Sequence, residues 1–321
     1  MKTLREVIAL VQQEIKNINY IGEPKELYDP MNYVLQLGGK RLRPVTVLLA
    51  ANLFSEEINC AVPAAKAVEV FHNFTLVHDD IMDNAPLRRG QETVHEKWND
   101  NVAILSGDSL LIKAYDHFLI GNYANLNAVL KVFNTTAIEV CEGQQLDMNF
   151  ETRDDVTISE YINMIRLKTS VLVGGAMKIG ALVANSSDED AQYIYDFGVN
   201  LGLAFQLQDD YLDCFGDPEK FGKQVGGDII SNKKTFMMLK ALELDNTGEL
   251  TRWLDKTDFD IVEKVTAVKL IYKNLGVDKL AFKLMDQYYN KGLESLQAIK
   301  IADVKKTTLK EFATELMKRA Y

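Results

Sequence analysis

The chain has 321 residues, 47% of them hydrophobic, which is enough for one large domain with a substantial core. Its formal net charge of -10 argues against a nucleic-acid partner, because nucleic-acid-binding proteins usually present a basic face. The three cysteines, Cys60, Cys141 and Cys214, are too few and too scattered for a disulfide framework or a paired metal site, which fits a reducing cytoplasm.

The pattern of apolar residues predicts helices along the chain. Residues 1–15 have the spacing of an amphipathic helix and lack the apolar region and cleavage site of a signal peptide. No proline falls between Pro86 and Pro218, and apolar residues recur there at helical spacing, so several long helices are expected. Residues 171–184 are apolar but short and contain Lys178, which predicts a buried helix rather than a transmembrane segment.

Breaks between helices are expected where glycine, proline, asparagine and aspartate gather. These segments are 21–30, 85–90, 119–126, 185–190, 215–228 and 244–250. The sequence contains no internal repeat, low-complexity tract or domain linker. It therefore predicts one all-α domain over residues 1–321, a bundle of about ten or more helices.

Two aspartate-rich motifs follow apolar helical stretches. Each has the pattern DDxxD: Asp79, Asp80 and Asp83 in the first, and Asp209, Asp210 and Asp213 in the second. The outer two aspartates of each motif are four residues apart, so they lie on one face of a helix. Carboxylate oxygens suit Mg²⁺, which takes only one or two carboxylates and leaves its other positions to water and phosphate. The repeated motif favours a site that binds a diphosphate through Mg²⁺ and neutralises its charge as it leaves.

Basic residues near both motifs supply the positive charge that a diphosphate needs. They are Lys40, Arg41 and Arg43 in GGKRLRP, Arg88 and Arg89 in LRRG, Lys168 beside Thr169, and Lys223, Lys233 and Lys234 after the second motif. The paired guanidinium groups just beyond Asp83 suit phosphate recognition. Arg41 and Lys234 are interpreted as ordinary solvated surface charges.

The segments GGKRLRP, LVHDDIMDNAPLRRG and FQLQDDYLDCFGD, followed by FGKQVGGDI and KKT, resemble the signature regions of the trans-isoprenyl diphosphate synthases, the polyprenyl synthetase family. The likeness runs from about residue 38 to residue 235 in the family's order. It implies the isoprenoid synthase fold, with helices around a central cavity. It also implies a Mg²⁺-dependent prenyltransferase that adds isopentenyl diphosphate head to tail to dimethylallyl, geranyl or farnesyl diphosphate.

The resemblance implies roles for single residues. The direct ligands of about three Mg²⁺ ions would be Asp79, Asp83 and Asp209, supported by Asp80, Asp210 and Asp213. The residues that would bind isopentenyl diphosphate are Lys40, Arg43, His72 and Arg89. Those that would hold the allylic diphosphate are Arg88, Lys168 and Lys233, with Lys223 nearby. The Thr169 hydroxyl and the Gln206 side chain would stabilise the allylic carbocation, and the departing diphosphate would take the final proton.

The length of the product is also suggested by the resemblance. In this family, bulky residues just before the first DDxxD motif close the tunnel that holds the growing chain. Phe74 lies five positions before Asp79 and Thr75 lies four before it, which is similar to the pattern of geranylgeranyl-type synthases with a C20 product. Farnesyl-type synthases tend to carry aromatics at both positions, and Phe71 could close the tunnel sooner. A C20 product is therefore expected, with C15 as the alternative.

Three other functions fit parts of the sequence. The pairs Glu69…His72 and Glu92…His95 have the spacing of di-iron ligands, but Pro86 and two arginines separate them. A class I terpene cyclase would carry a different second metal motif and would not need GGKRLRP. A non-catalytic regulatory subunit of a heteromeric synthase typically lacks one aspartate cluster, and both are intact here. The family further implies a cytoplasmic homodimer without a transmembrane segment.

Overall fold

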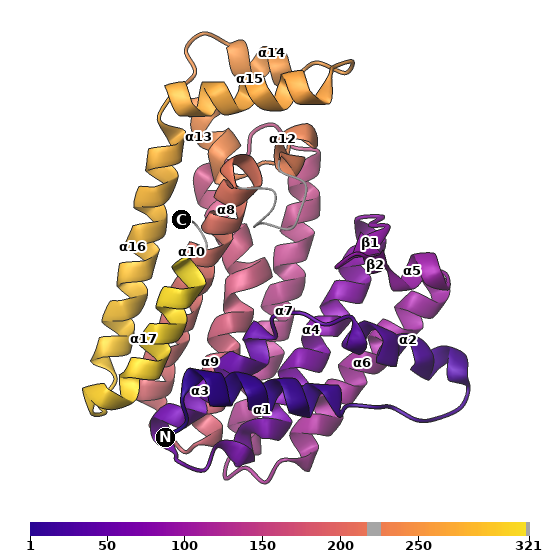
Figure 1. Cartoon of the computed structure of the whole chain (residues 1–321), viewed down its shortest axis with the longest axis vertical. Helices are drawn as coiled ribbons and strands as arrows, with labels where there is room; N and C mark the ends of the chain where they lie inside the picture. The colour runs from indigo at the N-terminus through magenta and orange to yellow at the C-terminus, as the bar shows by residue number, and fades with distance from the viewer. Residues whose placement is uncertain (217–225, 319–321) are drawn as a thin grey trace. The chain divides into compact units, whose positions relative to one another are not determined.

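The computed structural model describes residues 1–216 and 226–318, and almost all of its regular structure is helical (Figure 1). The predicted all-α fold class is confirmed. The chain divides into two compact units. Unit 1 consists of Met1–Asn134, Gly175–Tyr195 and Ile299–Leu309, and unit 2 of Thr135–Gly174, Asp196–Ala298 and Lys310–Tyr321. The single domain over residues 1–321 stays a prediction.

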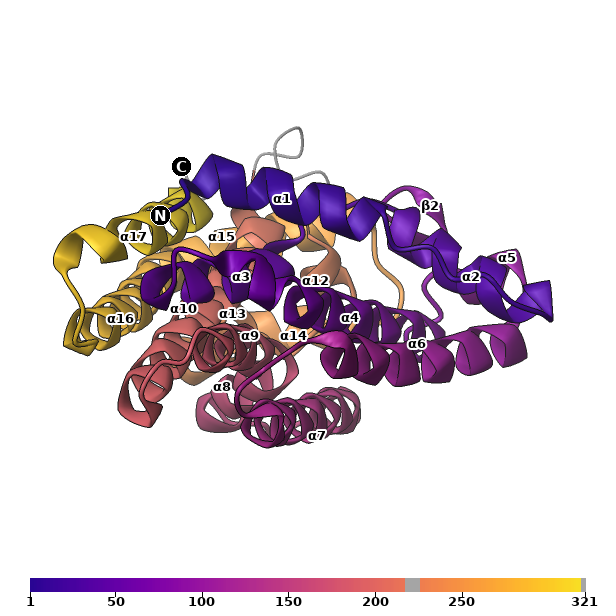
Figure 2. The ribbon, with the colours of Figure 1, turned by 90° about the horizontal axis from the view of Figure 1, so that it is seen from below.

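Most of unit 1 comes from the N-terminal part of the chain. Its elements are α1 (Leu4–Lys16), α2 (Lys25–Gln36), α3 (Leu42–Phe54), η1 (Ile58–Ala61), α4 (Val62–Met82), β1 (Leu87–Arg88), β2 (Gln91–Glu92), α5 (Val94–Lys97) and α6 (Asp100–Ile120). α4 and α6 lie side by side (Figures 1 and 2). The expected N-terminal amphipathic helix is confirmed as α1, which buries Leu4, Val7, Val11 and Ile15.

The break expected at 21–30 is wrong in its second half, because α2 begins at Lys25 and continues through Pro30. A proline inside a helix removes one hydrogen bond, here the one to the carbonyl of Glu26 in the first turn. Burial of the Pro30 side chain offsets part of that loss. Tertiary packing has therefore overridden the local turn signal.

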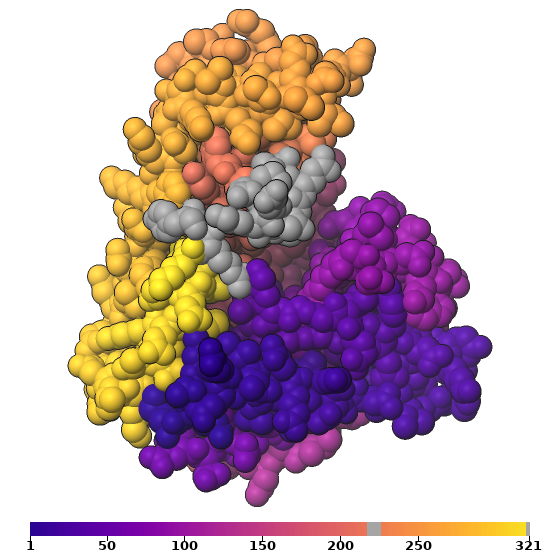
Figure 3. Space-filling model, viewed as in Figure 1, coloured from indigo at the N-terminus to yellow at the C-terminus, as the bar shows by residue number. Residues whose placement is uncertain are grey.

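Unit 2 takes most of the remaining chain. The later elements are α7 (Leu126–Glu151), α8 (Ile158–Ile165), η2 (Arg166–Ser170), α9 (Val171–Val183), α10 (Asp188–Phe215), α12 (Gly227–Ile230), α13 (Phe236–Leu244), α14 (Glu249–Leu254), α15 (Ile261–Asn274), α16 (Val277–Ala298) and α17 (Asp303–Met317). Of these, α7, α9, α10 and α17 contribute residues to both units. α14 and α15 lie at the surface of unit 2 (Figures 1 and 3). Within the described residues, no helix is long and apolar enough to cross a membrane.

Several predicted boundaries are confirmed. The expected breaks at 119–126, 185–190 and 244–250 each contain a junction between two helices, although α10 already begins at Asp188 and α14 at Glu249. The apolar stretch 171–184 forms α9, and its side chains are largely buried, as predicted. In the segment 215–228, α10 ends at its start and α12 begins near its end, and residues 217–225 lie outside the described residues.

α4 ends at the first aspartate motif through a Schellman cap. Asn84 has a φ of 48°, the left-handed conformation that commonly ends helices. The Ala85 N–H donates to the Asp80 carbonyl at 2.9 Å, and the Asn84 N–H donates to the Ile81 carbonyl at 3.2 Å. This cap turns the chain away from the helix axis, and the hairpin that follows carries Arg88 back to the motif.

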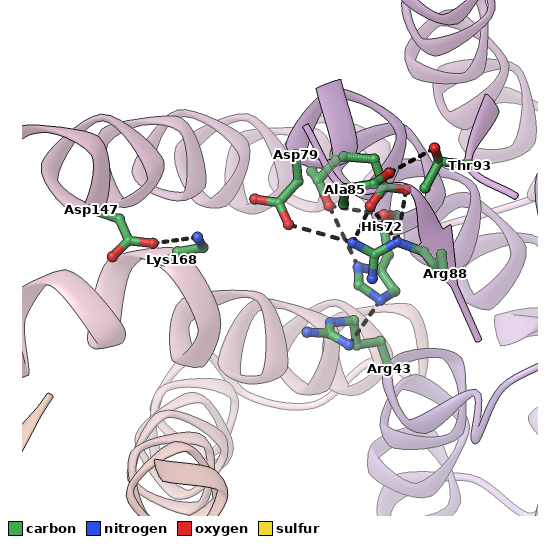
Figure 4. Close-up of polar contacts among 10 residues, drawn as sticks. Arg43, His72, Asp79, Ala85, Arg88, Thr93, Asp147 and Lys168 are labelled. Atoms are coloured by element: carbon green, nitrogen blue, oxygen red, sulfur yellow. Dashed lines mark hydrogen bonds and ion pairs between the residues drawn. The ribbon is translucent and has the colours of Figure 1, made fainter. Parts of the chain in front are cut away.

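The hairpin is held by a tight turn. Arg88 pairs with Gln91, and the two residues between them, Arg89 and Gly90, have φ values of 56° and 76°. Positive φ at both positions is typical of the type I′ turn, whose twist matches that of two antiparallel strands. The Thr93 hydroxyl donates to the carbonyl of Ala85 at 2.8 Å and closes the base of the hairpin (Figure 4).

A π-helical segment, η2, joins α8 to α9. The Ser170 hydroxyl donates to the Ile165 carbonyl, five residues earlier, at 3.3 Å. A Cβ on Gly143 of α7 would lie 2.1 Å from the backbone nitrogen of Lys168, and a Cβ on Gly202 of α10 would lie 2.8 Å from the Cα of Ser170. The two glycines let α7 and α10 approach this segment closely. π-Helical turns of this kind frequently occur at functional sites.

Candidate active site

The first aspartate motif contacts Arg88 of the hairpin (Figure 4). The Arg88 Nε lies 2.8 Å from both carboxylate oxygens of Asp80, and Nη2 lies 2.5 Å from Oδ1. Nη2 also lies 3.6 Å from Asp79 Oδ2. Burial raises the pKa of Asp80, but a guanidinium only donates hydrogen bonds, so these contacts favour the ionised carboxylate. Asp80 is thus held inside the protein, whereas Asp79 is half-buried and Asp83 is exposed.

Arg43 and His72, both predicted to bind isopentenyl diphosphate, contact each other. Arg43 Nη1 donates to His72 Nε2 at 3.0 Å (Figure 4). Because arginine cannot accept a hydrogen bond, Nε2 is the acceptor, and the neutral ring carries its proton on Nδ1. Burial and the charges of nearby arginines lower the pKa of His72 well below its ordinary value. His72 is therefore neutral and orients the charged Arg43 instead of adding a positive charge of its own.

The glycines of GGKRLRP let the loop before α3 lie against Arg89. Gly38 and Gly39 have φ values of 79° and 127°, which favour glycine. A Cβ on Gly39 would lie 2.6 Å from the Cζ of Arg89, and the Arg89 guanidinium donates to the Gly38 carbonyl. Lys40 follows directly and is exposed. Unit 1 thereby brings the glycine-rich loop and the hairpin together, as the predicted roles of Lys40 and Arg89 require.

Arg41 is not the solvated surface charge that the sequence suggested. Its side chain is 8% exposed and forms an ion pair with Glu69 of α4, whose side chain is 2% exposed. Arg41 also donates to the Leu35 carbonyl at 2.5 Å, and Glu69 accepts from Asn73 at 3.2 Å. The ion pair joins the end of α2, the start of α3 and α4. It also occupies the carboxylate that a di-iron site would need as a ligand.

In unit 2, Asp210 of the second motif is buried in a hydrogen-bonded network. The Tyr161 hydroxyl donates to Asp210 Oδ2, and Gln206 Nε2 donates to Oδ1 at 3.1 Å. Gln206 Oε1 in turn accepts from the Thr169 hydroxyl at 3.3 Å. Burial and the carboxylate of Asp228 raise the pKa of Asp210 to about 7. The network joins Thr169 and Gln206, the two residues predicted to stabilise the carbocation.

Asp213 holds the backbone of the segment that carries Lys233. The Gly226 N–H donates to the Asp213 carbonyl at 2.7 Å, and the Asp228 N–H donates to Asp213 Oδ1 at 3.0 Å. The Lys233 N–H then donates to the Asp228 carbonyl at 2.9 Å. The first residues of this segment are therefore hydrogen-bonded to the second aspartate motif. Lys223, predicted near the allylic diphosphate, lies outside the described residues.

Two lysines of unit 2 are bonded to α7 or its C-terminal end. Lys168, in the π-helical segment, donates to Asp147 Oδ2 at 2.6 Å (Figure 4). Lys234 donates to the Glu151 carbonyl at 3.1 Å and lies 3.9 Å from Asp154. Its side chain is 18% exposed, so the interpretation of Lys234 as an ordinary surface charge is also wrong.

Three polar residues that contact predicted catalytic or diphosphate-binding residues were missed from the sequence: Asp147, Tyr161 and Asp228. A single acid or tyrosine in a helical run has no spacing that distinguishes it from a surface or core residue. Asp228 gave the nearest signal, because it closes the GGD tripeptide within a segment that matched the family's pattern.

Phe71 and Phe74 lie in different surroundings. Phe71 is 1% exposed, and its ring and that of Phe133 pack nearly perpendicular to each other with centroids 5.1 Å apart. Phe74 is half-buried, with its centroid 5.6 Å from Phe71 and 4.8 Å from His78. The Thr75 hydroxyl donates to the backbone carbonyl three residues earlier at 2.8 Å. Phe71 thus belongs to a packed aromatic cluster, and Phe74 lies at its edge.

An all-α fold with a DDxxD motif and cationic side chains in each unit is typical of the isoprenoid synthases. Residues 24–275 match the family model of the polyprenyl synthetases. The chain is 39% identical over 320 residues to the geranylgeranyl diphosphate synthase of Methanosarcina mazei, covering 97% of this chain and 95% of that one. It is 34% identical over 333 residues to the geranylfarnesyl diphosphate synthase of Natronomonas pharaonis, covering 97% and 95%.

A crystal structure of a geranylgeranyl pyrophosphate synthase matches with a TM-score of 0.95 at 49% identity, covering 99% of both chains. This chain belongs to the polyprenyl synthetase family. Membership confirms the predicted enzyme class, a trans-prenyltransferase of isoprenoid biosynthesis.

Proposed function

We propose that this chain condenses isopentenyl diphosphate head to tail with allylic diphosphates and that its main product is geranylgeranyl diphosphate, a C20 compound. The observation that carries the proposal is the end of α4, where Arg88 binds Asp80 beside Asp79. Carboxylates for a cation and a guanidinium for phosphate meet there in one place. The relatives named geranylgeranyl synthases support C20, and a relative named a geranylfarnesyl synthase marks a longer alternative.

The carboxylates fit Mg²⁺. The proposed ligands are Asp79, Asp83 and Asp209, with Asp80, Asp210 and Asp213 behind them. Asp80 and Asp210 accept hydrogen bonds from protein donors, which suits supporting roles. Mg²⁺ usually takes one or two protein carboxylates and fills its other positions with water and phosphate oxygens, so Asp79, Asp83 and Asp209 need not form a complete ligand set by themselves. When bound, Mg²⁺ would stabilise the charge that develops on the departing diphosphate.

The side chains proposed for substrate binding divide into two groups. For isopentenyl diphosphate they are Lys40, Arg43 and Arg89, with neutral His72 orienting Arg43. For the allylic diphosphate they are Arg88, Lys168 and Lys233. The hydrogen bonds to Asp80 and Asp147 fix two of these cations before substrate arrives, which reduces the entropy lost on binding.

The reaction breaks the C1–O bond of the allylic diphosphate and leaves an allylic cation. Thr169 donates its hydroxyl hydrogen to Gln206, so its oxygen lone pairs remain available to stabilise a positive charge. The double bond of isopentenyl diphosphate then attacks C1 and forms the new carbon–carbon bond. Loss of a proton to the released diphosphate completes the new double bond. Water has to be excluded until then, because it would capture the cation.

The stoichiometry of the reaction tests this proposal. Purified protein is incubated with Mg²⁺, farnesyl diphosphate and isopentenyl diphosphate. The expected result is release of diphosphate in equal amount to the isopentenyl diphosphate consumed, with no release when isopentenyl diphosphate is omitted. Release without isopentenyl diphosphate, together with a cyclic hydrocarbon, would identify a class I terpene cyclase instead. No turnover by folded protein would favour a regulatory subunit.

The product should lengthen beyond C20 when Phe74 is replaced by alanine. Phe74 is the half-buried aromatic on α4 before the aspartate motif, and loss of its ring would open the end of the tunnel. Thr75→Ala is the matched control, because it removes little volume and should leave C20 as the main product. Chromatography of the dephosphorylated products measures the length. An unchanged C20 product from Phe74→Ala would assign the tunnel end to Phe71 and the aromatic cluster behind it.

Homodimer assembly and a cytoplasmic location stay predictions. α6 supports the dimer, because Leu105, Ile112 and Leu119 recur every seven residues and are 59%, 63% and 63% exposed. A two-fold axis would pack this stripe against its own copy in a second chain. Ile112→Asp is expected to give a monomer in sedimentation, whereas Val304→Asp, at another exposed apolar residue, should leave the dimer intact. A monomeric wild type, or a dimeric Ile112→Asp variant, would contradict this assignment.

A further inference from the structure

Lys264 of α15 is a buried cation whose role the proposed reaction leaves open. It is 0% exposed, although lysine is almost never fully buried unless it is paired. Its Nζ donates to Asn232 Oδ1 at 2.7 Å and lies 3.5 Å from the Ile230 carbonyl and 4.1 Å from the centre of the Phe259 ring. Among the described residues, no acid pairs with it. Burial of an ammonium group against neutral oxygens is costly, so these contacts require an explanation.

The contacts of Lys264 fix the turn that precedes Lys233. Asn232 has a φ of 53°, which places its backbone in the left-handed region and reverses the chain there. Its side-chain amide is bonded at both ends: Oδ1 accepts from Lys264, and Nδ2 donates to the Leu254 carbonyl at 3.0 Å. The turn is therefore tied to α14 and α15 directly before Lys233.

The same segment is held at its other end by the second aspartate motif. Asp213 accepts from the N–H groups of Gly226 and Asp228. A Cβ on Gly226 would lie 2.9 Å from Val265, the residue after Lys264, so the backbone of this segment lies directly against α15. Residues 226–233 are thus fixed by Asp213 at one end and by Lys264 at the other.

We propose that Lys264 is a positioning residue for the allylic diphosphate: it holds the Asn232 turn and thereby sets where Lys233 stands relative to the second aspartate motif. This inference rests on the proposed role of Lys233 in binding that diphosphate. Lys264 touches no substrate and acts only through Asn232. The hydrogen bond from the ammonium group fixes the orientation of the Asn232 side-chain amide, whereas an apolar residue of the same volume would fill the space without orienting it.

Steady-state kinetics separate this role from a general loss of structure. Lys264→Met keeps the stem and removes the ammonium group. We expect the KM for the allylic substrate to rise about tenfold, since small misplacements of binding groups have large kinetic effects. The KM for isopentenyl diphosphate should change less than about twofold, because its proposed ligands belong to unit 1. Lys264→Arg, which keeps a donor, should recover part of the loss. Lys283→Met, at an exposed lysine of α16, should behave as wild type.

Hydrogen exchange gives a readout that does not depend on activity. Backbone amides of residues 229–235 should exchange faster in Lys264→Met than in wild type or Lys283→Met. Asn232→Gly keeps the left-handed turn but lacks the side-chain amide that Lys264 binds. It should therefore also raise the KM for the allylic substrate and speed up exchange. Combining it with Lys264→Met should add little to either effect. Equal rises in both KM values, or unchanged exchange, would overturn the inference. If the wild type fails to condense its substrates, the proposed function fails, and exchange still decides whether Lys264 fixes the segment.

Discussion

Replacement of Asp79 by asparagine is expected to lower kcat by about a thousandfold or more, with little change in stability. Asparagine keeps the size of the side chain and one oxygen but removes the negative charge that would bind Mg²⁺. Asp79 is half-buried at the end of α4 and lies 3.6 Å from Arg88, so it stands where carboxylate and guanidinium meet. Loss of that charge would weaken the grip on the departing diphosphate in the transition state.

A matched acid on the neighbouring helix controls for general effects of charge removal. Asp108 of α6 has a side chain that is 58% exposed and lies outside the proposed site, so Asp108→Asn should keep kcat within about twofold. The measurement is kcat at saturating substrates over a range of Mg²⁺ concentrations, with thermal unfolding to show that both variants fold. A kcat near wild type for Asp79→Asn would remove Asp79 from the metal site.

Arg88→Leu should have the second-largest effect, on both stability and activity. Asp80 is 3% exposed, and loss of Arg88 would leave its carboxylate buried without its ion pair. Breaking a buried pair from one side costs about 3 kcal/mol or more. The same change removes a proposed allylic-diphosphate ligand, so kcat/KM for the allylic substrate should fall about a hundredfold. Denaturant unfolding and initial rates measure the two effects separately.

Arg89 provides a neighbouring control with different contacts. Its side chain is exposed and donates to the Gly38 carbonyl rather than to a buried acid. Arg89→Leu should therefore change stability by less than about 1 kcal/mol and raise mainly the KM for isopentenyl diphosphate. Combining Asp80→Asn with Arg88→Leu should recover much of the stability but none of the activity. Equal stability of Arg88→Leu and wild type would contradict the structural role assigned to this pair.

The helical elements and the aspartate motifs were predictable because they depend on local spacing. Apolar residues at helical period give the buried face of α1, and a continuous apolar run gives the largely buried helix α9. A separation of four residues places Asp79 and Asp83 on one face. The resemblance to a family added the roles of residues far apart in the chain. Residue spacing alone would have predicted only two helices that end in acidic residues.

The partners of these residues were not predictable, because they depend on turns and close approaches. Arg88 reaches Asp80 from a short hairpin that follows the left-handed residue Asn84 at the end of α4 and is closed by a type I′ turn. The π-helical segment that contains Lys168 lies so close to α7 that only a glycine, Gly143, fits at the point of contact. Neither feature has a spacing rule that separates it from an ordinary loop or helix.

Burial of charge was the other point at which sequence reasoning failed. Arg41 was interpreted as a surface residue because lone basic residues usually are, and the structure buries it against Glu69. Lys264 gave no signal in the sequence for the same reason, yet it is fully buried. Whether such a residue is buried depends on its tertiary contacts, which cannot be read from a single sequence.

The central claim is that this chain elongates allylic diphosphates to C20. The most direct measurement is the chain length of products formed from labelled isopentenyl diphosphate with Mg²⁺ and dimethylallyl, geranyl or farnesyl diphosphate in turn. Geranylgeranyl diphosphate is predicted as the main product from all three primers, with no product when Mg²⁺ is chelated. A stop at C15 would contradict the assigned length, and no elongation of any primer by folded, Mg²⁺-loaded protein would contradict the synthase function itself.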